Sequence, residues 1–140
     1  MPMNDLARKD VVTAQKDTPI SEISSMMKKE KVGSVIITND RKPVGIVTDR
    51  DIATRAFDGK SNPREKTAKD IMSESLCIAE EDMGLHEALE MMEEEGVRRL
   101  PICNSKGELS GIVTFDDLTE LISNEESSMA NVVRSQRPAY

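Results

Sequence analysis

The chain has 140 residues, of which 32% are charged and 2% are aromatic, and its net charge at pH 7 is −7. This length suits one ordinary domain, or two small domains that share a core. The negative charge argues against general nucleic-acid binding, which requires a basic face. The apolar runs are too short to cross a bilayer and the N-terminus has no apolar signal region, so we expect a cytoplasmic protein without membrane contact.

The first part of the chain predicts the order strand, helix, strand, strand, helix. Residues 11–14 form a short apolar segment, and Thr18 and Pro19 are typical of a helix cap and a first helical position. Apolar residues at a spacing of three to four then indicate one buried face of that helix. The remaining predicted elements are a strand at 34–38, a turn at 39–43, a strand at 44–47 and a helix from Thr48 to about Gly59.

The second part repeats this order after a polar linker at 59–68. The predicted elements are a strand at 76–79, a helix through 85–92, strands at 100–103 and 109–113, and a helix at 116–123. The residues that follow, 124–140, lack apolar periodicity. We expect them to form a mobile tail or a docking segment.

The two parts share a phrase. Gly45–Ile52 reads GIVTDRDI and Gly111–Leu118 reads GIVTFDDL, a shift of 66 residues from position 45 to position 111. Upstream, Glu22 matches Glu87 at a shift of 65, because the second hairpin turn has one more residue. A period of this length indicates two copies of one small α/β unit. A unit of about 60 residues has a marginal core, so we expect the copies to pack together.

Each shared phrase contains a Thr-x-x-Asp sequence that follows a strand and begins a helix, Thr48 to Asp51 and Thr114 to Asp117. One interpretation is a capping box, in which these side chains satisfy the free N–H groups of the helix start. The other is a ribose clamp, because a carboxylate accepts hydrogen bonds from both hydroxyls of a cis-diol and a helix N-terminus favours an anion. The two interpretations are compatible.

The element order, the phrase Gly-Ile-Val-Thr-x-x-Asp and the stretch Val97–Ile102 resemble a tandem pair of cystathionine β-synthase (CBS) domains, a Bateman module. The resemblance covers roughly residues 3–123, with no catalytic or channel domain attached. It implies an α/β (α+β) fold of two β-α-β-β-α repeats packed around a pseudo-twofold axis. The implied parts are a first CBS domain at 3–58, a linker at 59–68, a second CBS domain at 69–123 and a tail at 124–140.

The resemblance also implies a function. Such a pair is a regulatory or sensor module, not an enzyme, and binds an adenosine-type ligand (AMP, ADP, ATP or S-adenosylmethionine) in clefts between its repeats. It implies a homodimer as well, and a regulated enzyme or transporter as partner. The alternative is an interaction or dimerisation scaffold that binds no ligand.

Nine residues form the site that the resemblance implies. The ribose would meet the threonine and aspartate of each phrase, and the base would lie against an isoleucine of the preceding strand. Arg98 and Arg99 would reach the phosphate of the ligand held by the first phrase, and Arg50 the phosphate of the second ligand. The ribose and base residues are Thr48, Asp51, Ile46, Thr114, Asp117 and Ile112.

The arginines are distributed unevenly between the copies. The counterparts of Arg98 and Arg99 in the first copy are Gly33 and Ser34, and the counterpart of Arg50 is Asp116. We therefore expect the first phrase to bind anions better than the second. One histidine and two distant cysteines make neither a metal cluster nor a catalytic set, so we expect no required cofactor and no metal.

Overall fold

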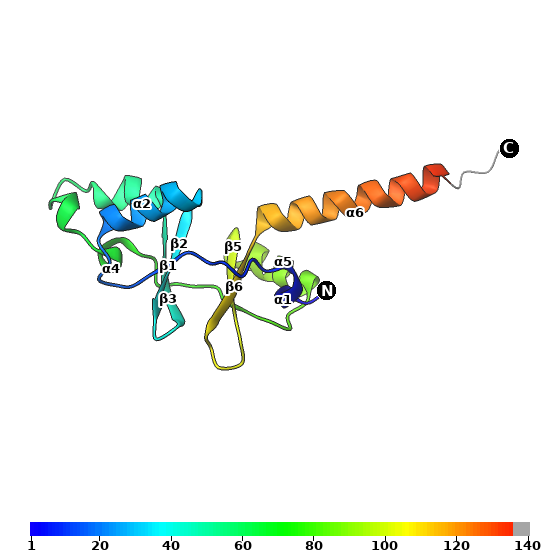
Figure 1. Ribbon diagram of the computed structural model, residues 1–140, viewed down its shortest axis with the longest axis horizontal. Coiled ribbons are helices and arrows are strands. Elements are labelled where there is room, and N and C mark those ends of the chain that lie inside the picture. Colours follow the sequence, from blue (N-terminus) through cyan, green and yellow to red (C-terminus); the bar gives the residue numbers. More distant parts are fainter. Residues whose placement is uncertain (136–140) are drawn as a thin grey trace.

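The computed structural model describes residues 1–135, and residues 136–140 lie outside the described part. Its framework is two three-stranded sheets, one from each copy, with strand orders β1-β2-β3 and β4-β5-β6. Figure 1 shows the two copies beside each other, each with its helices against its own sheet. The expected α/β class is confirmed.

Each copy has the predicted element order. The first copy contains β1 (Thr13–Ala14), α2 (Ile20–Glu30), β2 (Ser34–Asn39), β3 (Lys42–Thr48), α3 (Asp49–Asp51) and η1 (Ile52–Ala56). The second copy contains β4 (Ala79–Glu80), α5 (Leu85–Glu95), β5 (Arg99–Cys103), β6 (Leu109–Thr114) and α6 (Phe115–Ser135). Within each sheet the first strand is parallel to the second, and the second and third form an antiparallel hairpin.

The first long helix begins one residue later than expected. The residue before α2 is Pro19, whereas the sequence predicts Thr18 as the cap. The Thr18 hydroxyl instead accepts a hydrogen bond of 3.0 Å from the Gln15 N–H in the preceding turn. The hydroxyl is thus engaged outside the helix, and the helix starts at Ile20.

Short helices precede each copy and pack on the other copy. Helix α1 (Met3–Leu6) lies before the first copy, and α4 (Ala68–Ile71) lies before the second, after a short turn η2 (Pro63–Glu65). Met3 is fully buried in the hydrophobic core of the second copy. Ala68 and Ile71 are buried in the core of the first copy. Figure 1 shows both connecting segments crossing between the copies. Each hydrophobic core is therefore completed by a short helix that precedes the other copy in the sequence.

The exchange is reciprocal at the level of single residues. Arg8 pairs with Ile112 on β6, and Ser73 pairs with Ile46 on β3. A shift of 65 relates Arg8 to Ser73, and a shift of 66 relates Ile46 to Ile112. Contacts that repeat when the partners are interchanged are those of a twofold arrangement. The copies are thus related by a pseudo-twofold, as the resemblance implies.

The glycine of each shared phrase allows the crossing segment to approach the sheet. A Cβ atom at Gly111 would lie 2.7 Å from the Ala7 Cβ and 3.0 Å from the Arg8 carbonyl oxygen. A Cβ atom at Gly45 would lie 2.6 Å from the Met72 Sδ. The absence of a side chain at these two positions therefore lets each crossing segment lie against the sheet of the other copy.

The last helix differs from the expectation. The sequence predicts that it ends at Ser123, with a tail from residue 124, but α6 continues to Ser135. Residues 124–135 contain no glycine or proline to stop a helix. Met129, Val132 and Val133 recur at the three-to-four spacing of a helix, contrary to the expectation, but they do not pack on the body, and Met129 is 67% exposed. In Figure 1 this half of α6 projects away from both sheets. No helix within residues 1–135 has the length and apolar character needed to span a bilayer.

Candidate functional site

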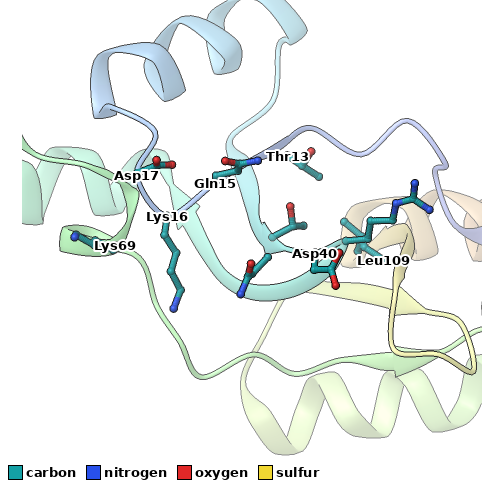
Figure 2. A pocket seen from close by; sticks show the side chains of 10 residues that line it. Thr13, Gln15, Lys16, Asp17, Asp40, Lys69 and Leu109 are labelled. Atoms are coloured by element: carbon teal, nitrogen blue, oxygen red, sulfur yellow. The ribbon is translucent and has the colours of Figure 1, made fainter.

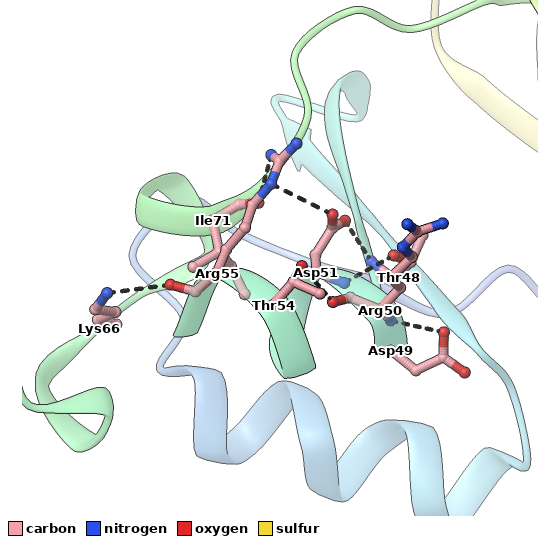
Figure 3. A network of polar contacts seen from close by, with 8 residues as sticks. All are labelled: Thr48, Asp49, Arg50, Asp51, Thr54, Arg55, Lys66 and Ile71. Carbon is pink, nitrogen blue, oxygen red and sulfur yellow. Dashed lines mark hydrogen bonds and ion pairs between the residues drawn. The ribbon is translucent and has the colours of Figure 1, made fainter. Parts of the chain in front are cut away.

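The first site is defined here by Thr48 and Asp51, at the end of β3 and the start of α3. The Asp51 N–H donates to the Thr48 Oγ at 3.1 Å, and the Thr48 N–H donates to the Asp51 Oδ2 at 2.9 Å. This is the complete capping box that the phrase predicts. Figure 3 shows both bonds and the surrounding network. Capping fixes the carboxylate at the helix start without using all of its acceptor positions.

The other carboxylate oxygen of Asp51, Oδ1, lies near the Arg55 guanidinium but is not hydrogen-bonded to it. The Arg55 Nε lies 3.7 Å from the Asp51 Oδ1, which is beyond hydrogen-bond distance. The Arg55 guanidinium instead donates to the Ile71 carbonyl oxygen at 3.2 Å (Figure 3). The Asp51 side chain is only 15% exposed. It therefore retains an oxygen that can accept a hydrogen bond in a largely desolvated position.

The second site is defined here by Thr114 and Asp117, at the end of β6 and the start of α6. The Asp117 N–H donates to the Thr114 Oγ at 3.1 Å, as in the first site. The carboxylate, however, receives two hydrogen bonds from Arg8: Nη2 to Oδ1 at 2.6 Å and Nε to Oδ2 at 3.1 Å. A guanidinium is planar and matches a carboxylate in this forked way. Both oxygens of Asp117 are engaged by the chain itself.

The Arg8 contact changes the titration of the second site. The hydrogen bonds from Arg8 lower the pKa of Asp117 below its ordinary value, burial opposes this, and the Thr114 hydroxyl adds to the lowering. The same contact raises the pKa of Arg8. Sequence reasoning missed Arg8. Extending the repeat alignment to the N-terminus aligns it with Ser73, so the sequence shows only that the two copies differ in charge at this position.

A cavity of about 290 Å³ lies at the second site, with walls from both copies. The second copy contributes Ile112, Thr114, Asp116 and Asp117, and Arg8 lies between the copies. Small drug-sized ligands occupy pockets that begin at about 300 Å³. The other lining residues are Asp10, Val11, Val12, Glu30, Val32, Gly33, Ser34, Ile36 and Arg99.

The three predicted phosphate-binding arginines have different surroundings. Arg99 lines the cavity of the second site, although the sequence assigns it to the first. Arg98 donates to the Asp116 Oδ1 at 2.7 Å and its guanidinium carbon lies 5.0 Å from the centre of the Phe115 ring. Arg50 is exposed, and its N–H donates to the Asp49 Oδ1. Their roles toward a ligand remain predictions.

The predicted base-binding isoleucines carry the backbone pairing of the crossing segments. Ile112 exchanges hydrogen bonds of 2.9 and 3.0 Å with Arg8, and Ile46 exchanges bonds of 2.9 and 3.0 Å with Ser73. Ile112 also lines the cavity. Both residues are therefore held in equivalent places beside the two helix starts.

A larger cavity lies elsewhere, at the turn of the first hairpin (Figure 2). It has a volume of about 770 Å³, and no sequence motif indicated it. Lys16, Arg41 and Lys69 line it together with Asp17 and Asp40, so positive and negative charges nearly balance. Neither Thr-x-x-Asp phrase contributes to it.

Within residues 1–135 no group of three or more histidine, cysteine, aspartate or glutamate side chains is arranged to hold a metal ion. Cys77 and Cys103 are free thiols, and burial raises the pKa of both. A raised pKa disfavours the reactive thiolate.

Comparison with protein families finds two matches to the CBS domain model, at residues 3–58 and 68–124. The CBS domain-containing protein YhcV of Bacillus subtilis is 31% identical over 129 residues, which is 91% of each chain. The uncharacterized protein MK0525 of Methanopyrus kandleri is 39% identical over 120 residues, 85% of this chain and 61% of the relative. The inosine-5'-monophosphate dehydrogenase of Methanocaldococcus jannaschii is 34% identical over 82% of this chain, which spans 22% of that enzyme.

Two solved structures extend the comparison. The CBS domain pair of protein MJ0100, crystallised with 5'-methylthioadenosine and S-adenosyl-L-methionine, superposes with a TM-score of 0.79 at 25% identity, covering 89% of this chain and 98% of that one. The CBS domain protein PAE2072 from Pyrobaculum aerophilum, complexed with AMP, gives a TM-score of 0.74 at 26% identity, covering 84% and 90% of the two chains.

Proposed function

The chain belongs to the CBS domain family as a tandem pair of repeats, and we propose that it is a regulatory module that binds an adenosine-type ligand. The two similar structures hold AMP in one case and 5'-methylthioadenosine with S-adenosyl-L-methionine in the other. These ligands share an adenosine with a ribose cis-diol. A carboxylate fixed at a helix start is the group that such a diol requires.

The observation that carries this proposal is the state of Asp51. Its carboxylate is fixed by the capping box, is largely buried, and keeps an oxygen outside hydrogen-bond distance of Arg55. Thr48 adds a hydroxyl beside it. We assign the ribose of the ligand to Thr48 and Asp51, and the adenine to the side of Ile46.

The phosphate of a nucleotide ligand is assigned to Arg98 and Arg99. Guanidinium groups bind phosphate oxygens in a forked geometry and stay charged at every physiological pH. Arg98 is held by an exposed ion pair with Asp116 and by its position over the Phe115 ring, contacts that contribute little in water and can be exchanged for a ligand. This assignment favours AMP, ADP or ATP over S-adenosylmethionine, whose adenosine carries no phosphate.

Calorimetric titration with AMP, ADP, ATP, S-adenosylmethionine and adenosine tests the proposal. We expect saturable binding of at least one of these ligands. Asp51→Ala should weaken ribonucleotide binding by about 1.5–3 kcal/mol, the contribution of a hydrogen bond to a charged group. The 2'-deoxy form of the same ligand should lose much less, because it offers only one hydroxyl.

A second variant separates binding from capping. Asp51→Asn keeps a side-chain oxygen for the Thr48 N–H but removes the charge, so the helix start should persist while ribose affinity falls. Equal losses for the ribose and deoxyribose forms would show that Asp51 acts only as a helix cap. Binding of none of the five ligands by the parent protein would contradict the proposal.

A second candidate function is an interaction scaffold, and the exposed part of α6 favours it. Met129, Val132 and Val133 are more than half exposed on a helix that projects from the body. We propose a homodimer in which helices of two copies cover such surfaces, and a regulated enzyme or transporter as the partner of the module. Light scattering at micromolar concentration tests the first point, and a monomeric mass would contradict it. A scaffold would gain no thermal stability from any of the ligands above.

A further inference from the structure

We propose that Arg8 decides which of the two sites accepts an adenosine ribose, because it donates hydrogen bonds to both carboxylate oxygens of the second site, whereas within residues 1–135 no arginine donates a hydrogen bond to the carboxylate of the first site. This inference rests on the proposed function, since it concerns the same two helix starts. It makes the pair unequal through one residue of the N-terminal segment. The first site is then the primary ligand site, and the second opens only when Arg8 is displaced.

The geometry of the second site supports this assignment. Arg8 donates to both oxygens of Asp117, and it lies in the cavity that a ligand would have to enter. A ribose diol and this guanidinium need the same two oxygens, so they compete. The Arg8 side chain is 64% exposed, and the Asp117 carboxylate that it contacts is only 21% exposed. Two backbone hydrogen bonds with Ile112 fix the position of Arg8, so its side chain begins beside the second site.

The first site lacks an equivalent device. The residue equivalent to Arg8 is Ser73, which makes the same pair of backbone hydrogen bonds, in its case with Ile46. A serine side chain is too short to fork onto a carboxylate. Arg55 does approach Asp51, but at 3.7 Å and while bound to the Ile71 carbonyl oxygen. The two crossing segments thus have the same backbone geometry, but only the segment that carries Arg8 binds the aspartate of its site.

A reciprocal exchange of residues tests the inference. Arg8→Ser gives the second site the residue of the first, and Ser73→Arg gives the first site the residue of the second. Adenosine is the first probe, because it has the ribose and no phosphate for an arginine to attract. Calorimetry of the parent should show one stronger and one weaker class of site. Arg8→Ser should tighten adenosine binding at the weaker class by up to about fivefold, the upper end for removing an exposed competing ion pair. Ser73→Arg should weaken the stronger class by a similar factor.

Conservative variants and a second probe keep the result interpretable. Arg8→Lys retains the charge but cannot form the fork, so it should open the second site partly. Circular dichroism and thermal melting establish that each variant is folded. AMP, the second probe, distinguishes an Arg8 that blocks the second site from an Arg8 that binds the phosphate of the ligand. If Arg8→Ser weakens AMP binding at the second site, Arg8 binds the ligand and the inference is overturned.

The inference and the proposed function fail in different ways. Two equal classes of adenosine site in the parent, unchanged by Arg8→Ser, would overturn the role of Arg8 and leave the ligand function intact. No binding of adenosine or AMP by the parent or by any variant would overturn both. Tightening in Arg8→Ser together with weakening in Ser73→Arg supports both.

Discussion

The first and second sites have the same backbone frame and different charges. Around the second site the charged lining residues are Arg8 and Arg99 against Asp10, Glu30, Asp116 and Asp117, a net charge of −2. The repeat alignment gives the equivalent positions around the first site as Ser73, Ser34, Ser75, Glu95, Arg50 and Asp51, with Arg98 and Arg99 in place of Gly33 and Ser34. Three arginines against Glu95 and Asp51 give a net charge of +1.

The residues that build the fold recur in the two copies, whereas the charges that flank the proposed ligand sites do not. The helix-start threonine and aspartate, the glycine that admits the crossing segment and the hairpin register recur in both copies. The flanking charges do not recur. A positive site favours an anionic ligand and a negative site with a bound arginine disfavours it. On our proposal, the pair therefore offers one site suited to nucleotides and one whose carboxylate is held by Arg8.

The largest expected effect concerns the exchange that holds the copies together. Met3→Ala should lower the free energy of unfolding by about 2–5 kcal/mol, the range for truncating a buried large side chain. Met3 is fully buried in the second core although it precedes the first copy. Urea denaturation measures the change. Met1→Ala is the matched control, because Met1 is 64% exposed. Similar small losses for both variants would show that α1 does not close the second core.

The next effect concerns the charge difference between the sites. Replacing Arg98 and Arg99 together with alanine should weaken binding of AMP by about 1.5–3 kcal/mol, because hydrogen bonds to a charged group are lost. Adenosine binding should hardly change, and the dependence of AMP binding on salt should become flatter. Calorimetry at two ionic strengths measures both quantities.

The matched control for this double variant is Arg134→Ala, at the far end of α6. It removes a positive charge that lies away from both sites. Unchanged AMP affinity in the double variant would show that Arg98 and Arg99 are only surface charges, and the charge difference would then have no bearing on the ligand.

Much of this fold follows from local patterns in the sequence. The β-α-β-β-α order, the two hairpins and the capping role of Thr48 with Asp51 depend on neighbours a few residues apart, and the structure has all of them. The predicted start of α2 and the predicted end of α6 were wrong. The Thr18 hydroxyl accepts a hydrogen bond in the preceding turn and does not cap α2, and α6 continues because no residue stops it.

The features that sequence analysis missed depend on distant contacts. Met3 closes a core whose other members come from the second copy, and Arg8 binds an aspartate 109 positions away. Neither contact leaves a periodic signal. Both become visible only when the repeat alignment is combined with the knowledge that the segments are exchanged.

A smaller effect distinguishes the two crossing segments. Gly111→Ala should lower the free energy of unfolding by about 1–3 kcal/mol, because the new Cβ meets the Ala7 Cβ and the Arg8 carbonyl, which are close to the backbone. Gly45→Ala should lower it less, because the closest atom to its new Cβ is the Sδ of the Met72 side chain, which can change rotamer, and the Ser73 carbonyl oxygen lies further away at 3.1 Å. Thermal or urea denaturation of the two variants in parallel measures this. A larger loss for Gly45→Ala would reverse our view of which segment is held more tightly.

The smallest effect is the pH dependence that the Arg8 contact gives to the second site alone. Arg8 lowers the pKa of Asp117 in the folded chain, below the ordinary value of about 4. The contribution to stability is therefore fully present above that ordinary pKa and is lost as the pH falls through the lower, folded pKa. Because Arg8 is well exposed, we expect only about 0.2–1 kcal/mol.

The measurement is the difference in free energy of unfolding between the parent and Arg8→Ser, followed by urea denaturation from pH 7 to pH 2. Taking the difference removes the titration of the other carboxylates, which both proteins share. The parent should be the more stable at pH 7, and the difference should shrink as the pH falls and Asp117 becomes protonated. A difference that stays constant or grows on acidification would mean that Arg8 stabilises the chain through packing, not through Asp117. Ser73→Arg should acquire the same pH-dependent difference, because it would place the fork on the aspartate that is now free.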